Sequence, residues 1–166
     1  MLSNALVEAI NRQVRDEVYS AYLYLGMSAY CESINMPGFA HWMRTQFQEE
    51  LGHALKLMEH LHDRGGRATL QSIEAPPAQW KNPLDVFQAT LDHERKVTAK
   101  INELYSLATK ENDYAAQSFL LWFVNEQVEE EKVASLIVEQ LKVVGDRGGG
   151  ILFLDKQLGK RTAEAE

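Results

Sequence analysis

The chain has 166 residues, 45% of them hydrophobic and 25% charged, the composition of an ordinary globular domain with room for a buried core. Its formal net charge of −7 argues against a nucleic-acid surface, which needs clustered lysine and arginine, and its apolar runs are too short to cross a membrane. With Cys31 as its one cysteine and no signal-peptide core near the N-terminus, we expect a reducing, cytoplasmic setting without disulfides or C-x-x-C motifs.

Two long helices are predicted in the first part of the chain. Ser3 can cap the first, which continues to about Ser33 with apolar residues recurring at three- and four-residue steps. The break at 35–38 contains Pro37, which suits the first turn of a second helix, and Gly65-Gly66 ends that helix.

A long connection follows, from Gly66 to Lys81. The second helix covers roughly 42 Å at about 1.5 Å per residue. An extended connection of this length reaches at most about 50 Å at roughly 3.3 Å per residue. It can therefore run the full length of a bundle, which would make the second and third helices parallel.

Two more long helices are predicted after this connection. Asn82-Pro83 provides a cap followed by a proline at the first helical position, and the third helix runs to about Glu111. Asn112-Asp113 begins the fourth helix, which stops at Gly145.

The predicted fold class is all-α, with one domain over residues 1–166. A four-helix bundle with one long crossover occupies residues 3–145. A short C-terminal helix follows over about 150–159, and residues 160–166 form a polar tail.

Each of the four long helices carries a glutamate near its midpoint: Glu17, Glu50, Glu94 and Glu130. The midpoints of bundled helices lie at one level, so the four acids can converge. A packed interior disfavours such a cluster unless a cation compensates it. Glu50 also opens an E-x-x-H pair with His53, one turn away on the same face. Carboxylate and imidazole without thiolate favour iron or manganese, so the pattern predicts a metal centre.

The charge count suits two metal ions, since four carboxylates balance two divalent cations. Bundles with two metals commonly use two E-x-x-H pairs, but the fourth helix offers Gln127-x-x-Glu130, with a neutral amide in place of one ligand. Oxidation to Fe(III) would add two positive charges that the protein cannot match. The centre is therefore suited to turnover rather than to permanent storage of two ions.

Further acids surround this predicted centre. Glu49 adjoins Glu50, while Glu126 and Glu129 can share a face with Glu130. The run 129–131 can also be a solvated charged surface, and we keep that interpretation for Glu131. For Glu49, Glu126 and Glu129 we favour a third, more exposed metal position.

Tyr24 lies seven residues after Glu17, two turns along the same stripe of the first helix. From there it could hydrogen-bond near the metals or supply an electron. The alternative for a tyrosine at such a position is simple core packing.

These features together resemble a bacterial non-haem ferritin over essentially the whole chain. The resemblance rests on Glu17 with Tyr24, on Q-E-E-L-G-H (48–53), on D-H-E-R (92–95) and on N-E-Q-V-E-E (125–130). It implies a homo-oligomeric hollow shell of twenty-four subunits that acts as a ferroxidase. Such a shell oxidises Fe(II) with dioxygen or hydrogen peroxide and stores a ferric oxyhydroxide mineral.

The resemblance also implies a role for each matching position. Glu17, Glu50 and His53 would hold the first iron, and Glu50 would bridge to a second iron bound by Glu94 and Glu130, with Gln127 alongside. Glu49, Glu126 and Glu129, with Glu130, would form the third iron position. Tyr24 would stand beside the di-iron centre.

One departure separates the chain from bacterioferritins. They carry a second E-x-x-H on the fourth helix and a haem-ligating methionine directly after the glutamate of the first E-x-x-H. Here those places hold Gln127-x-x-Glu130 and Leu51, so we expect no haem. Two other functions remain open: a shell-forming bundle whose acids only nucleate mineral, and a monomeric di-iron oxygenase.

Overall fold

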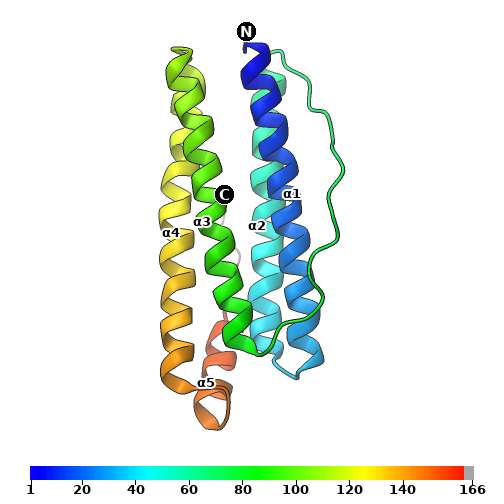
Figure 1. The fold of residues 1–166 in the computed structure, drawn as a ribbon, viewed down its shortest axis with the longest axis vertical. Coiled ribbons are helices and arrows are strands. Elements are labelled where there is room, and N and C mark those ends of the chain that lie inside the picture. Colours follow the sequence, from blue (N-terminus) through cyan, green and yellow to red (C-terminus); the bar gives the residue numbers. More distant parts are fainter. Residues whose placement is uncertain (163–166) are drawn as a thin grey trace.

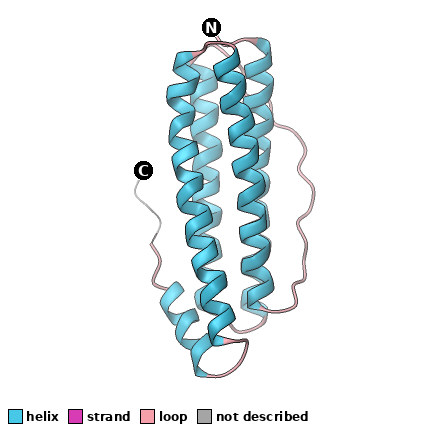
Figure 2. Ribbon diagram, turned by 60° about the vertical axis from the view of Figure 1, so that its left-hand side comes forward, coloured by secondary structure: helices cyan, strands magenta, loops and turns pink. Residues whose placement is uncertain are grey.

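The computed structural model describes residues 1–162, so residues 163–166 of the predicted tail lie outside it. Within this range the helices are α1 (Asn4–Ser33), α2 (Pro37–Asp63), α3 (Pro83–Lys110), α4 (Tyr114–Val144) and α5 (Gly149–Leu158). The four long helices form a bundle, and α5 lies at one end of it (Figures 1 and 2). The prediction of an all-α four-helix bundle with a short C-terminal helix is confirmed.

Polar side chains cap three of the four long helices, as the sequence predicted. The Ser3 hydroxyl accepts a hydrogen bond from the Leu6 N–H at 3.1 Å. The side chain of Asn82 accepts one from Asp85, and that of Asp113 accepts one from Ala116, each at 2.9 Å. Each cap bonds a backbone N–H that the first turn of a helix otherwise leaves unpaired.

The start of α2 is capped from a distance by α5. Met36, at the N-cap position, provides no side-chain acceptor. Instead the Asp155 carboxylate accepts from the N–H of Gly38 at 3.1 Å and from the N–H of Phe39 at 2.8 Å. A Cβ on residue 38 would lie 1.7 Å from the carbonyl oxygen of Asp155, so this close approach requires glycine. The contact fixes α5 against the first turn of α2.

The connection between α2 and α3 runs along α1 from one end of the bundle to the other (Figure 1). As predicted, α2 and α3 are therefore parallel. Asn11 on α1 holds the connection, because its amide donates to the carbonyl of Arg67 at 3.0 Å and accepts from the N–H of Thr69 at 2.7 Å. Farther along, a Cβ on Gly26 of α1 would meet the Pro76 ring at 3.2 Å.

Two apolar clusters fill the bundle. The one nearer α5 includes Phe39, Trp42 and Phe87, and the one at the opposite end includes Leu57 and Ile101. Seven buried polar side chains, drawn from all four long helices, fall in chain position between the two clusters: Glu17, Gln46, Glu50, His53, Glu94, Gln127 and Glu130. The fold thus places a polar layer at mid-height in the bundle.

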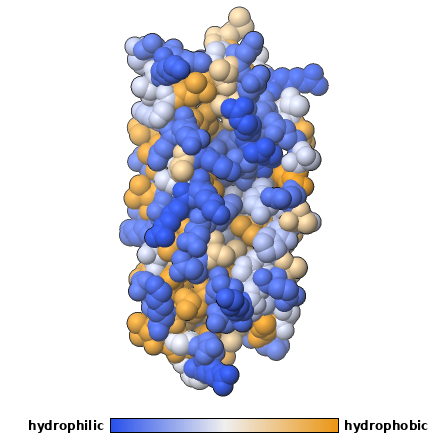
Figure 3. Space-filling model, viewed as in Figure 1, coloured by the Kyte–Doolittle hydropathy of each residue, from blue (hydrophilic) through white to orange (hydrophobic). Residues whose placement is uncertain are grey.

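The surface carries both polar and large apolar side chains. The face drawn in Figure 3 is mostly hydrophilic, with apolar side chains scattered between charged ones. Among the described helices, none is long and apolar enough to span a membrane.

Candidate metal centre

Glu17 on α1 and the Glu50–His53 pair on α2 form a compact ligand group. One ligand atom of each lies within 4.8 Å of the other two, and the three residues are 1%, 2% and 4% exposed. His53 Nδ1 is 3.5 Å from Glu50 Oε2. The ring of Trp122 packs edge-on against that of His53, with centroids 5.3 Å apart. Two carboxylates and an imidazole at this spacing can bind a divalent cation.

The environment of Glu17 is the strongest indication that this group can bind a cation. Its Oε1 accepts a hydrogen bond from Gln13 Nε2 at 2.9 Å, but its Oε2 is buried without a hydrogen-bond partner. Burial raises the pKa of Glu17 well above its usual value, and the neighbouring Glu50 carboxylate raises it further. An orphaned carboxylate oxygen is costly in a packed interior, and a bound metal ion would remove that cost.

Glu94 approaches the same layer from α3 and is held by two donors. The Tyr24 hydroxyl donates to Glu94 Oε1, and Gln127 Nε2 donates to Glu94 Oε2 at 3.1 Å. Burial raises the pKa of Glu94, while the hydrogen bonds from Tyr24 and Gln127 oppose that rise. Gln127 also reaches Thr98 Oγ1 at 3.2 Å, so its amide nitrogen is committed to α3.

Glu130 completes the layer from α4. Gln46 Nε2 donates to Glu130 Oε2 at 2.7 Å and lies 3.5 Å from Glu50 Oε1, linking two acids on different helices. Burial and the nearby Glu94 charge raise the pKa of Glu130 to about 8. Burial also raises the pKa of Glu50, to which Glu94 and Glu130 add. Without cations, the four carboxylates therefore resist being ionised together.

The outer acids are arranged differently. Glu49 is partly buried and accepts a hydrogen bond from the Arg161 guanidinium. Glu126 is partly buried, and the exposed Glu129 pairs with Lys132 at 3.1 Å. Within residues 1–162, these acids do not form a ligand group as compact as that of Glu17, Glu50 and His53.

Two glutamines that hydrogen-bond carboxylates of the layer were not predicted from the sequence. Gln13 and Gln46 are 3% and 0% exposed, and each lies one turn before a predicted ligand, Glu17 or Glu50. Residues four apart share a helix face, so this spacing was a usable signal. The contact of Arg161 with α2 was not predicted either, because it forms only through tertiary folding and no local sequence pattern indicates it.

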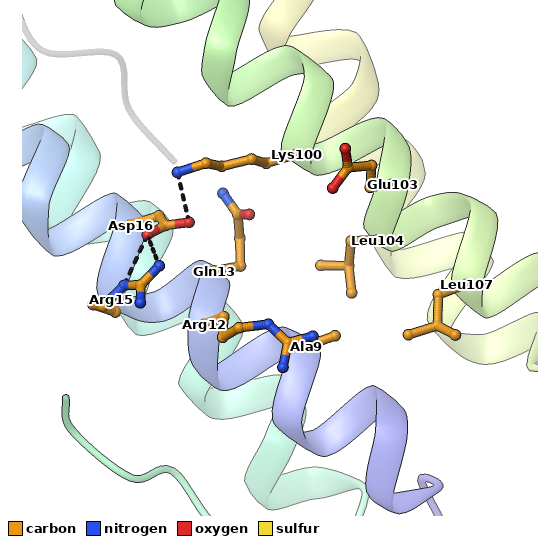
Figure 4. Close-up of a pocket in the computed structure, with 9 residues that line it drawn as sticks. All are labelled: Ala9, Arg12, Gln13, Arg15, Asp16, Lys100, Glu103, Leu104 and Leu107. Carbon is orange, nitrogen blue, oxygen red and sulfur yellow. Dashed lines mark hydrogen bonds and ion pairs between the residues drawn. The ribbon is translucent and has the colours of Figure 1, made fainter.

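A surface pocket of about 270 Å³ between α1 and α3 reaches Gln13 (Figure 4). Its rim carries the Asp16 carboxylate, which pairs with Arg15 at 2.6 Å and with Lys100 at 2.9 Å. Because Gln13 lines the pocket and also bonds Glu17, this glutamine is a shared wall between the pocket and the metal-ligand layer.

Comparison with known proteins agrees with the geometry. The family model for the ferritin-like domain matches residues 7–144. The chain is 46% identical to a bacterial non-heme ferritin of Bacteroides fragilis, over 97% of this chain and all of that one. It is 36% identical to a bacterial non-heme ferritin of Staphylococcus aureus over the full length of both.

Solved structures give the same result. The fold matches an Archaeoglobus fulgidus ferritin engineered into a closed form, with a TM-score of 0.97 and 48% identity, over 99% of this chain and all of that one. An open-pore ferritin from the same archaeon matches with a TM-score of 0.96. The chain therefore belongs to the ferritin family, as its motifs predicted.

Proposed function

We propose that this protein is an iron-storage ferritin that oxidises Fe(II) in the polar layer of its bundle and stores the product as ferric mineral. The observation that carries this proposal is the buried group of Glu17, Glu50 and His53, in which Glu17 Oε2 lacks a partner. Iron is the substrate here, held by carboxylates whose negative charge divalent cations balance.

In this proposal, the ligand layer receives two Fe(II) ions. The first is held by Glu17, Glu50 and His53. Glu50 bridges to the second, which Glu94 and Glu130 also bind, with Gln127 alongside. The raised pKa values of the carboxylates support this arrangement, because bound cations would replace the protons that burial makes these groups retain.

Oxidation then removes one electron from each Fe(II). A dioxygen molecule that accepts both electrons and two protons leaves as hydrogen peroxide, and peroxide can oxidise a further pair. The two extra positive charges exceed what four carboxylates can neutralise. The ferric product therefore leaves with hydroxide or oxide for the mineral. Tyr24 donates a hydrogen bond to Glu94 and so would fix that ligand beside the two irons.

The finer expectations from the sequence belong to the same proposal. A third iron would bind between Glu49, Glu126, Glu129 and Glu130, once Glu49 separates from Arg161 and Glu129 from Lys132. Twenty-four copies of the chain would form the cytoplasmic shell. Large apolar side chains are exposed on the isolated subunit, among them Leu70 at 75%. Their exposure supports the assembly, because contacts between copies would bury them.

An anaerobic Fe(II) titration of the metal-free protein tests the proposal. Two or three ions bound per subunit are expected, followed on aeration by rapid ferric absorbance. Glu17→Ala and His53→Ala should abolish the rapid phase, whereas Glu139→Ala, which removes an exposed acid of α4 paired with Lys142, should not. Oxidation at the parent rate in both ligand variants would refute the assigned centre. Sedimentation of a monomer would refute the shell.

A further inference from the structure

The chain returns to the metal-ligand layer after α5, through Arg161. The segment leaves α5 at Gly159, where an added Cβ would lie 3.0 Å from the Cα of Gly38. The N–H of Arg161 donates to the carbonyl of Leu158 at 3.2 Å, which continues the turn. This glycine-to-glycine contact lets residue 161 lie directly against α2.

Arg161 is held there by several independent contacts. Its guanidinium donates to Gln46 Oε1 at 2.7 Å and, through its other arm, to Glu49 Oε2. The guanidinium carbon lies 4.5 Å from the ring centroid of Trp42, and the carbonyl oxygen is 2.7 Å from His41 Nε2. With its side chain 20% exposed, Arg161 is a fixed part of this surface rather than a solvated cation.

The contact with Gln46 has a directional consequence. A glutamine amide has an accepting oxygen and a donating nitrogen, and a guanidinium can only donate. Because Arg161 takes the oxygen end, the nitrogen end must face the other way. There it meets Glu130 Oε2 at 2.7 Å and Glu50 Oε1 at 3.5 Å. Gln46 is 0% exposed, so no bulk water is at hand to replace either partner.

We propose that Arg161 is a positioning residue of the iron centre, which orients the Gln46 amide so that it donates to Glu130 and Glu50. The inference rests on the proposed ferroxidase function, since those two acids are proposed iron ligands from different helices. A donor fixed on one oxygen of each carboxylate leaves the other oxygen turned toward the metal. If Arg161 is lost, the amide is free to rotate and present its oxygen to the carboxylates, which repels them.

The test uses assembled shells of the full chain and measures Fe(II) binding without oxygen, then the rate and apparent KM of oxidation. Arg161→Ala should weaken binding of the first two Fe(II) ions about tenfold, the usual cost of removing a group that orients a metal ligand. Arg161→Lys should restore part of the loss, because one ammonium can donate to Gln46 but cannot reach Glu49 in the same forked geometry. Lys160→Ala is the matched control, since it removes a neighbouring positive charge whose side chain donates to Gln157 at 3.3 Å.

A double-variant cycle shows whether Arg161 acts through Gln46. If it does, Arg161→Ala should have no further effect on Fe(II) binding in a Gln46→Ala background. Additive losses would overturn the inference, and so would parent-like binding in Arg161→Ala. Should that variant fail to assemble, Arg161→Met keeps the aliphatic contact with Trp42 without any donor and carries the same comparison.

The two proposals fail in different ways. If Glu17→Ala and His53→Ala oxidise iron like the parent, the centre itself is wrong. If those variants are inactive but the Arg161 variants match the parent, only the positioning role is wrong.

Discussion

Tyr24 on α1 donates its hydroxyl hydrogen to the carboxylate of Glu94 on α3, between two helices whose side chains meet in the ligand layer. The two residues are 0% and 1% exposed, so neither group can exchange this bond for water. The bond opposes the effect of burial on Glu94 by favouring its ionised form. A tyrosine at this place therefore does more than fill the core.

Tyr24→Phe tests that role with almost no change in volume. Losing the donor should raise the pKa of Glu94 further, because a hydrogen bond to the ionised form is lost while burial remains. Fe(II) must then displace a more tightly held proton, so the pH profile of iron oxidation should move to higher pH. Tyr114→Phe, at a tyrosine that is 76% exposed, should leave the profile in place. An unshifted profile in Tyr24→Phe would show that Glu94 is not the group being loaded.

The metal-free protein should lose stability as the pH rises from about 5 to about 8. Burial raises the pKa of Glu130 to about 8, and it also raises those of Glu17, Glu50 and Glu94 above their usual values. In this window these four carboxyl groups bind more protons in the folded chain than in the unfolded chain, so they lower the free energy of unfolding as the pH increases. Thermal midpoints of the chelated protein across this range measure the slope. Zn(II) should flatten the slope, and Glu130→Gln should reduce it.

Much of this polar layer could be predicted because its members are set by local rules. Glu50 and His53 share a helix face whatever the tertiary structure, and Glu17, Glu94 and Glu130 were found because helix midpoints coincide in a bundle. The length of the crossover fixed the direction of α3. These arguments need only helix periodicity and chain reach.

Local rules could not predict the contacts made by α5 and by the segment that follows it. Asp155 caps α2, and Arg161 touches Gln46, although both come from the far end of the sequence. The apolar pattern of α5 shows that it packs but does not show against what. Gln13 and Gln46 are an intermediate case, because their four-residue spacing from Glu17 and Glu50 was visible but did not separate a ligand-holding amide from an ordinary buried one.

The contact between α5 and α2 can be tested at Gly38. A Cβ in Gly38→Ala would lie 1.7 Å from a backbone oxygen of Asp155, so α5 must move and the cap on α2 is lost. The expected cost is about 1–3 kcal/mol, seen as a lower thermal midpoint and faster amide exchange in Gly149–Leu158. Gly149→Ala is the control, because a Cβ there meets nothing within 4 Å. Equal stability of the two variants would mean that α5 is not anchored through Gly38.

The hydrogen bond from Gln127 to Glu94 explains why this position of α4 holds a neutral amide. Its nitrogen lies 3.1 Å from Glu94 Oε2, and Gln127→Glu would replace that donor by a further negative charge in a layer that already resists ionisation. The metal-free variant should lose about 1–3 kcal/mol of stability at neutral pH, because a buried donor is lost and a like charge is added. The loss should shrink when acid protonates the layer or when Zn(II) supplies positive charge. Gln140→Glu, an exposed change on the same helix, should show neither the loss nor its rescue. A Gln127→Glu protein as stable as the parent without metal would mean that the layer tolerates a fifth carboxylate, and the charge balance proposed for two Fe(II) ions would no longer hold.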